Sequence, residues 1–498
     1  MAFDGCDAAD EIVVCIGAGP AGLTAGYLLS KAGRRVVVLE ADPVHVGGIS
    51  RTETYKGFHF DIGGHRFFSK SEEIERLWDE MLDEPFLLRP RKSRIFYRGS
   101  LFDYPLRAGD ALAKLGPVEA LRCVASYARA ALGPKAEARS FEDWVVARFG
   151  RRLFEIFFKT YTEKVWGMPC SEISADWAAQ RIKGLNLFQA IRHSLLPQRN
   201  GTPRGQIIKT LVNEFRYPRL GPGQLWESVV RRIQAQGGEV RLGHRVTALR
   251  RDAEGWTVEA AGPDGPVSLR CGHVVSSMPV RELVGALDPV PSAPVRQAAA
   301  ALRYRDFLTV ALVLVDRQRF DDNWIYIHDP GVKVGRIQNF KSWSPAMVPD
   351  AALTCYGLEY FCFEGDGLWS ATDADLVRRA GEELVHLGLA AREDILDGTV
   401  IRQPKAYPVY DADYQDHVAT IRAALESFCP GLHLVGRNGM HKYNNQDHAM
   451  MTAMLTVRNI LAGRTLYDVW RVNQDAEYHE EASHDAPEQG GRLVPAQI

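Results

Sequence analysis

A glycine-rich turn near the N-terminus has the spacing with which a main chain approaches a pyrophosphate. The turn Gly17-Ala18-Gly19-Pro20-Ala21-Gly22 follows the apolar run 12–16 and opens a helical pattern over 23–31. The glycines allow the backbone to come close, and the helix directs its positive end at the phosphate charge. Glu40 ends the next strand pattern, where a carboxylate binds ribose hydroxyls, and Ala41 follows it. Together these features predict a dinucleotide-binding βαβ unit.

Two further glycine pairs indicate which dinucleotide is bound. Gly47-Gly48-Ile49-Ser50-Arg51 lies just past the acid, and Gly63-Gly64-His65 comes a few residues later. Paired glycines let the main chain pass close to a large flat cofactor, and Arg51 has the charge to neutralise a phosphate. Taken alone, each pair is also consistent with an ordinary turn. In combination with the βαβ unit they predict FAD.

These residues need a scaffold that brings distant segments together. Strand patterns between 239 and 270 follow a helical pattern over 224–236, and the apolar run Leu432–Gly436 precedes a helix over 449–461. We assign both stretches to the nucleotide-binding lobe and expect Val246 to contact the cofactor. The lobe is therefore woven from segments far apart in the chain.

A second lobe is expected to hold the substrate. Strand patterns over 307–315, 324–328 and 353–363 predict its sheet, and helical patterns dominate from about 71 to 218. The predicted fold is α/β: a Rossmann-like FAD-binding domain of the glutathione-reductase type, interwoven with an α+β substrate domain that has a mixed or antiparallel sheet and a helical insertion. The expected divisions are a discontinuous FAD-binding domain (1–75, 219–290 and 430–465), a helical insertion (76–218), a substrate-domain sheet with helices (291–429) and a disordered polar tail (466–498).

Composition limits the partners. The 498 residues are 46% hydrophobic and carry a formal net charge of -2, which favours neither nucleic acid nor an anionic membrane. The eight cysteines are scattered without a CxxC pair, so we expect no metal site and a reducing compartment. No secretory signal and no apolar window of membrane-spanning length is visible, and we expect a cytoplasmic protein.

Three stretches resemble the FAD-binding superfamily that includes amine oxidases, protoporphyrinogen oxidase and UDP-galactopyranose mutase, and they favour the mutase branch. They are Gly63-Gly64-His65-Arg66-Phe67-Phe68-Ser69, then Lys164-Val165-Trp166 continuing to Trp177 and Arg181, and Gly436-Arg437-Asn438-Gly439 continuing through Tyr443 to Asn445-Gln446-Asp447-His448. The resemblance covers nearly the whole chain.

The resemblance implies roles at the flavin. His65 matches the histidine at the reactive flavin edge, where a neutral imidazole hydrogen-bonds the N5 region; a surface or capping histidine is the alternative. Gly436 ends a predicted strand, and Asn445 and Gln446 precede a helix whose positive end faces the flavin pyrimidine. Arg437 stands where many flavoproteins carry an acid, a departure that the mutase-like proteins share.

The resemblance also implies a diphosphate site. Arg181 matches an arginine that contacts the diphosphate, and Tyr443 and Tyr410 match nearby tyrosines; a solvated arginine and ordinary packing are the alternatives. A second family arginine is missing from 309–316, which reads TVALVLVD. Three residues are candidates to replace it from a neighbouring strand: Arg336, Lys341 and Arg317.

Two enzymatic functions and one non-enzymatic role follow. In the first, reduced flavin N5 attacks the anomeric carbon of a nucleotide-activated sugar, and the sugar ring opens and recloses without net redox change. External NAD(P)H is a candidate reductant. In the second, oxidised FAD accepts hydride from an amine, a sugar or a partly unsaturated ring. A purely structural FAD is the third. Scaffolding, however, needs neither a placed histidine nor the basic and aromatic wall expected from Lys164-Val165-Trp166 through Arg181.

Overall fold

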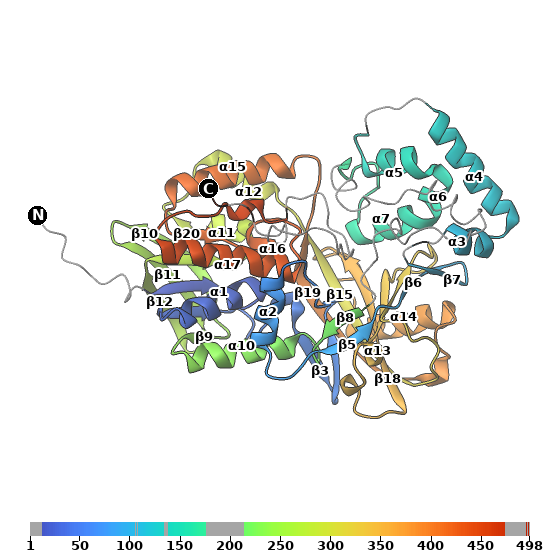
Figure 1. The fold of residues 1–498 in the computed structure, drawn as a ribbon, viewed down its shortest axis with the longest axis horizontal. Helices are drawn as coiled ribbons and strands as arrows, with labels where there is room; N and C mark the ends of the chain where they lie inside the picture. Colours follow the sequence, from blue (N-terminus) through green and yellow to red (C-terminus); the bar gives the residue numbers. More distant parts are fainter. Residues whose placement is uncertain are drawn as a thin grey trace, which may run out of the picture.

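A computed structural model describes residues 12–133 except 105 and 107, then 138–175, 214–473, 495 and 497. Two parts built on sheets lie next to each other, and a group of helices, α3 to α7, stands apart at one end (Figure 1). In the described part of the chain, no helix has the length and apolar character needed to span a membrane.

A parallel five-stranded sheet is assembled from three chain segments. Its order is β20 (Leu432–Leu434), β13 (His273–Ser276), β1 (Val13–Ile16), β2 (Val36–Leu39) and β9 (Glu239–Arg241), with every pair parallel. Strands β1 and β2 are buried throughout, which explains their unbroken apolar sequences. The last strand ends earlier than expected: Gly436 begins the short helix α16 (Gly436–Gly439) instead of ending a strand.

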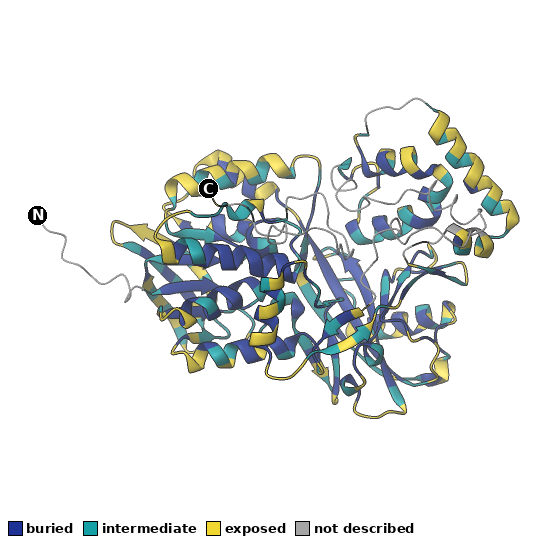
Figure 2. Cartoon of the chain, in the orientation of Figure 1, coloured by how far each residue is buried: buried dark blue, intermediate teal, exposed yellow. Residues whose placement is uncertain are grey.

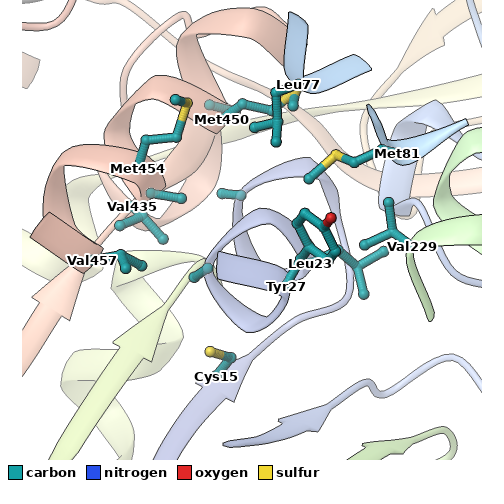
Figure 3. Close-up of a cluster of buried hydrophobic side chains, with 14 of the residues drawn as sticks. Cys15, Leu23, Tyr27, Leu77, Met81, Val229, Val435, Met450, Met454 and Val457 are labelled. Carbon is teal, nitrogen blue, oxygen red and sulfur yellow. The ribbon is translucent and has the colours of Figure 1, made fainter. Parts of the chain in front are cut away.

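Helices cover both faces of this sheet. On one face, α1 (Pro20–Lys31) packs against α17 (Gln446–Ala462), α10 (Gly223–Ala235) and α2 (Glu72–Met81). Leu23, Tyr27, Val229, Met450 and Met454 meet in the core between them (Figure 3). The other face carries α11 (Val280–Ala286), α12 (Ala293–Ala301), α15 (Tyr414–Phe428) and a second sheet of β12 (Gly265–Cys271), β11 (Gly255–Gly262), β10 (Arg245–Asp252) and β14 (Leu287–Asp288).

A seven-stranded mixed sheet forms the second part. Its order is β19 (Ile395–Pro408), β15 (Tyr304–Val315), β18 (Leu353–Cys362), β17 (Arg336–Asn339), β16 (Trp324–Ile327), β6 (Ser93–Tyr97) and β7 (Ser100–Asp103). Leu308, Val310 and Leu312 pack with α14 (Asp373–His386) on one face. Because side chains alternate along a strand, Thr309 lies on the opposite face, in a cross-strand row with Glu359 and Arg336.

The segment expected as a helical insertion contains strands as well as helices. Strands β6 and β7 join the large sheet, and β5 (Leu87–Pro90) pairs with β8 (Glu214–Tyr217). The helices are α3 (Ala108–Leu115), α4 (Pro117–Leu132), α5 (Phe141–Phe149), α6 (Arg151–Phe154) and α7 (Thr160–Trp166), with a π-helical turn over Glu155–Lys159. Most of α4 is exposed, including the apolar residues Leu121 and Leu132 (Figure 2). The remaining short elements are β3 (Thr52–Tyr55), β4 (Phe58–Asp61) and α13 (Phe340–Trp343).

Candidate active site

A cavity of about 570 Å³ opens at the carboxyl ends of β1 and β2. Ligands of open α/β sheets bind at this edge. Most of the predicted cofactor residues line it: Gly17, Gly19, Pro20, Ala21, Glu40, Ala41, Gly48, Ser50, His65, Val246, Gly436, Arg437, Asn445 and Gln446.

The three glycines of the first turn differ in what an added side chain would meet. Gly17 has a φ of +95°, and a Cβ there would lie 2.4 Å from Ser277 Oγ. A Cβ on Gly22 would lie 1.8 Å from the Gly17 carbonyl oxygen, so only glycine lets α1 pack this closely on the turn. A Cβ on Gly19, in contrast, would meet only the Cα of Gly48, at 3.9 Å. Its main chain is therefore open toward the cavity.

The acid after β2 is locked by two main-chain donors. Ala18 N donates to Glu40 Oε2 over 2.6 Å, and Asp42 N donates to Oε1 over 2.9 Å. A carboxylate accepts about four hydrogen bonds, so acceptor capacity remains for hydroxyls in the cavity. This is the geometry expected of a ribose-binding carboxylate.

The far end of the cavity suits a ring with hydrogen-bond donors. Asn438 Oδ1 and Gln446 Oε1 are buried acceptors on cavity-lining residues, and neither has a partner among the described residues. Helix α17 begins at Gln446, so its positive end also faces the cavity. Buried acceptors require donors, and a flavin ring presents an N–H to such a site. The residues present therefore fit FAD.

The remaining predicted cofactor residues shape the cavity without lining it. Gly47 (φ +97°) packs on Trp226, and Gly63 (φ +89°) and Gly64 pack against side chains of β17. Arg51 donates from Nε to Glu53 over 2.6 Å and from Nη1 to the Gly48 carbonyl over 3.1 Å. The proposed contact of Arg51 with a phosphate stays a prediction.

His65 is a neutral imidazole on the cavity wall. Its Nε2 lies 3.0 Å from the Ile62 carbonyl oxygen, so this nitrogen is the donor. Burial first, and then the charges of Arg437 and Arg336, lower the pKa of His65 to about 3. The ring therefore stays uncharged throughout the neutral range.

An anchored arginine lies beneath the Gly63-Gly64-His65 motif. Arg336 Nε donates to Glu359 Oε2 over 2.5 Å, and Glu359 is fully buried and also accepts from Gln338. A Cβ on Gly63 would lie 3.7 Å from Arg336 Nη2, so the guanidinium and the motif are in contact. No described residue accepts a hydrogen bond from Nη1 or Nη2 of this arginine. Both terminal nitrogens thus remain available to a ligand.

The other two candidate replacements for the missing arginine lie elsewhere. Lys341 Nζ is paired with Asp316 at 2.6 Å, and Arg317 is paired with Asp394 at 2.9 Å, with 59% of the Arg317 side chain exposed. Of the three residues, only Arg336 contacts the Gly63-Gly64-His65 motif.

The predicted basic and aromatic wall is described only in part. Lys164 Nζ donates to the carbonyls of Ile327, Asp329 and Val334 over 3.1, 2.7 and 3.0 Å, which ties α7 to the loop between β16 and β17. Burial lowers the pKa of Lys164 to about 8. Arg181 and Trp177 lie outside the described residues.

The predicted tyrosines are near each other but differ in setting. Tyr410 is buried and meets Trp166 edge-on, with ring centroids 5.7 Å apart. Tyr443 is half-buried and stacks on Tyr407 at 6.2 Å. Neither lines the 570 Å³ cavity, so their contact with a diphosphate stays a prediction.

Sequence reasoning missed several lining residues. They come from several elements and connecting loops: His244, Arg245, Thr247, Ser277, Met278, Pro279, Glu282, Gln403 and Asn444. Ser277, Met278 and Pro279 come directly after β13, an apolar run that was not assigned as a strand. Recognition of that strand would have placed them at the carboxyl edge.

Known proteins share this architecture. A crystal structure of reduced UDP-galactopyranose mutase superposes with a TM-score of 0.79 at 21% identity, covering 93% of this chain and 99% of that one. The predicted fold class is thereby confirmed.

Curated relatives match over shorter stretches. A probable UDP-galactopyranose mutase of Klebsiella pneumoniae is 27% identical over 174 residues, 33% of this chain and 43% of that protein. Putrescine oxidase of Kocuria rosea is 38% identical over 104 residues, 19% of this chain and 22% of that protein. The chain thus spans less than half the length of these curated relatives.

A family model matches most of the chain. The model of flavin-containing amine oxidoreductases covers residues 20–436. This match confirms the predicted superfamily. It also confirms the prediction of an FAD-dependent enzyme. The chain belongs to the flavin-containing amine oxidoreductase family.

Proposed function

We propose that the protein acts on a nucleotide-activated sugar and interconverts its pyranose and furanose ring forms. The observation that carries this proposal is Arg336, a guanidinium anchored through Nε and in contact with the Gly63-Gly64-His65 motif at the FAD cavity. UDP-galactopyranose mutase is also the name of both the solved structure and the Klebsiella relative given above. Reduced FAD, when bound, supplies a nucleophile toward the anomeric carbon.

The chain's own residues bind and orient the substrate in this proposal. Arg336 holds the diphosphate through Nη1 and Nη2, since a guanidinium bridges phosphate oxygens in pairs. Arg181, Tyr443 and Tyr410 complete the diphosphate site. His65 keeps its proton on Nε2 against the Ile62 carbonyl and orients the reactive edge of the cofactor as a neutral ring. No net oxidation occurs, so an external reductant such as NAD(P)H is needed only to prepare the cofactor.

A second candidate is hydride abstraction from a sugar, an amine or a ring by oxidised FAD. The family assignment favours it. The two candidates differ in product, since only this one consumes an electron acceptor. For either, we place the protein in the cytoplasm, where reduced cysteines persist.

Binding of UDP to the FAD-loaded protein tests the diphosphate site. UDP should perturb the flavin absorbance spectrum, and Arg336→Leu should weaken its binding by at least tenfold, because charged hydrogen bonds contribute about 1.5–3 kcal/mol. Arg317→Leu, which removes a cation paired elsewhere, should bind UDP as the unmodified protein does. The double variant Arg336→Leu/Glu359→Gln avoids a buried unpaired carboxylate and should behave like the single variant. Equal UDP affinity in all four proteins would contradict the proposal.

A further inference from the structure

Two nearly parallel tyrosine rings lie beside the FAD cavity. Tyr407 in β19 and Tyr443 before α17 stack with ring centroids 6.2 Å apart and an interplanar angle of 18°. Both side chains are half-buried, and Asn444, next to Tyr443, lines the cavity. Aromatic faces attract ammonium and guanidinium groups through their quadrupoles.

The chain supplies its own cation to this pair. The Arg437 guanidinium carbon lies 5.2 Å from the Tyr407 centroid and 5.1 Å from the Tyr443 centroid. Its Nε donates to the Asn444 carbonyl over 2.9 Å, and its Nη1 donates to the Ala406 carbonyl over 3.2 Å. Main-chain carbonyls fix the guanidinium in place, so it is oriented without a neutralising anion.

The surrounding charges leave this part of the site positive. Arg437 has no carboxylate within ion-pair distance in the described part of the chain, whereas the charge of Arg336 is balanced by Glu359. Both arginines interact electrostatically with Tyr407 and with His65. A protonated amine that approached the rings would therefore meet a fixed like charge in a poorly solvated space.

We propose that Arg437 determines substrate charge: it occupies the Tyr407–Tyr443 pair, excludes protonated amines and favours anionic ligands such as phosphate esters. The choice of anion rests on the function proposed above, while the exclusion of amines rests only on the contacts of Arg437. The residue thus separates this chain's substrates from those of an amine oxidase within the same family.

Paired titrations of the FAD-loaded protein test the inference, with UDP and n-butylamine as probes and the flavin spectrum as readout. The unmodified protein should respond to UDP and not to n-butylamine. Arg437→Leu should bind n-butylamine at least tenfold more tightly and UDP at least tenfold more weakly. Arg437→Lys keeps the charge and should still exclude the amine. Tyr407→Ala added to Arg437→Leu should abolish the gain, because the ring pair then no longer exists.

The FAD content of each variant is measured first, since Arg437 lines the cofactor cavity. If Arg437→Leu fails to retain FAD, a competition experiment on the unmodified protein tests the inference instead. There n-butanol, the neutral isostere, should compete with UDP better than n-butylamine does. Unchanged amine affinity in Arg437→Leu, or preference for the amine over the alcohol in the unmodified protein, would overturn the inference. An amine switch without any UDP binding would leave the inference standing and contradict the proposed function.

Discussion

The cofactor cavity and the face of the large sheet that carries Arg336 and Glu359 lie next to each other but are built in opposite ways. The cavity depends on main-chain geometry within short segments, such as Gly17 to Gly22 and Glu40. The sheet face depends on side chains from paired strands, such as Arg336 on β17 and Glu359 on β18, which meet only through strand register. A local motif therefore specifies the cofactor, whereas long-range pairing specifies what reacts with it.

The largest expected effect separates two glycines of the same turn. Gly22→Ala places a Cβ 1.8 Å from the Gly17 carbonyl oxygen, so the fold itself must shift. We expect its unfolding free energy to fall by about 3 kcal/mol or more, the upper range for overpacking. Gly19→Ala meets only Gly48, at 3.9 Å, and should keep the stability of the FAD-free protein while FAD content falls. Chemical denaturation and cofactor release measure both, and equal stabilities would show that the turn tolerates a side chain at either position.

His65→Ala tests the point where the two regions meet. Bound FAD should be retained, while turnover should fall by about a hundredfold or more, the scale for loss of a positioned polar group. Because the pKa of His65 is about 3, its ionisation should not appear in the pH profile of turnover between about pH 5 and 9. The matched control is His59→Ala on β4, which lies outside the cavity lining. Full activity and an unaltered flavin reduction potential in His65→Ala would show that His65 is an ordinary turn residue without a role at the flavin.

Arg181→Ala tests whether the substrate region is separate from the cofactor region. Loss of a phosphate contact should weaken substrate binding by about tenfold or more, corresponding to about 1.5–3 kcal/mol, with FAD content unchanged. Kinetics and cofactor quantification on the same preparation measure both. Loss of FAD would instead assign Arg181 to the cofactor site, and unchanged kinetics would assign it to the solvated surface.

The last effect, which vanishes near neutral pH, concerns a histidine on the sheet side. Burial lowers the pKa of His328 to about 3, and its ring stacks on Tyr161 at 5.3 Å. The unfolded chain binds a proton near pH 6.5 that the folded protein does not, so this group makes stability rise with pH between about 3 and 6.5.

His328→Phe preserves the stack and removes that contribution. The slope of unfolding free energy against pH should flatten by about 1.4 kcal/mol per pH unit in this window. Asp61, with a pKa raised to about 7 by burial, contributes with the opposite sign in both proteins and cancels in the comparison. An unchanged slope would mean that His328 is protonated in the fold.

The same contrast explains what the sequence could predict. Gly17 to Gly22 and Glu40 could be predicted because their motif is contiguous and carries its own turn chemistry, and His65 because its motif resembles that of a known family; Gly17, Glu40 and His65 line the cavity. Arg336 remained one of three candidates because the strand that carries it, β17, has only four residues and was not predicted. Its place beneath Gly63 depends on pairing with β18, which no local pattern encodes.

The pairing of aromatic side chains also could not be predicted from the sequence. Tyr443 was identified from a motif, but its stacking partner Tyr407 lies thirty-six positions earlier on β19. The bond between Arg437 and the Ala406 carbonyl depends on how β19 passes α16. Side-chain chemistry at such crossings follows from packing of whole elements, not from spacing within one of them.

The most direct test of the proposed function is the redox balance of turnover. FAD-loaded protein is reduced with dithionite under anaerobic conditions and incubated with UDP-galactopyranose. We predict that the furanose isomer accumulates over many turnovers while the flavin stays reduced, and that the oxidised protein is inactive. Substrate consumption by the oxidised protein alone, with one hydrogen peroxide or one reduced acceptor formed per product, would contradict the proposal.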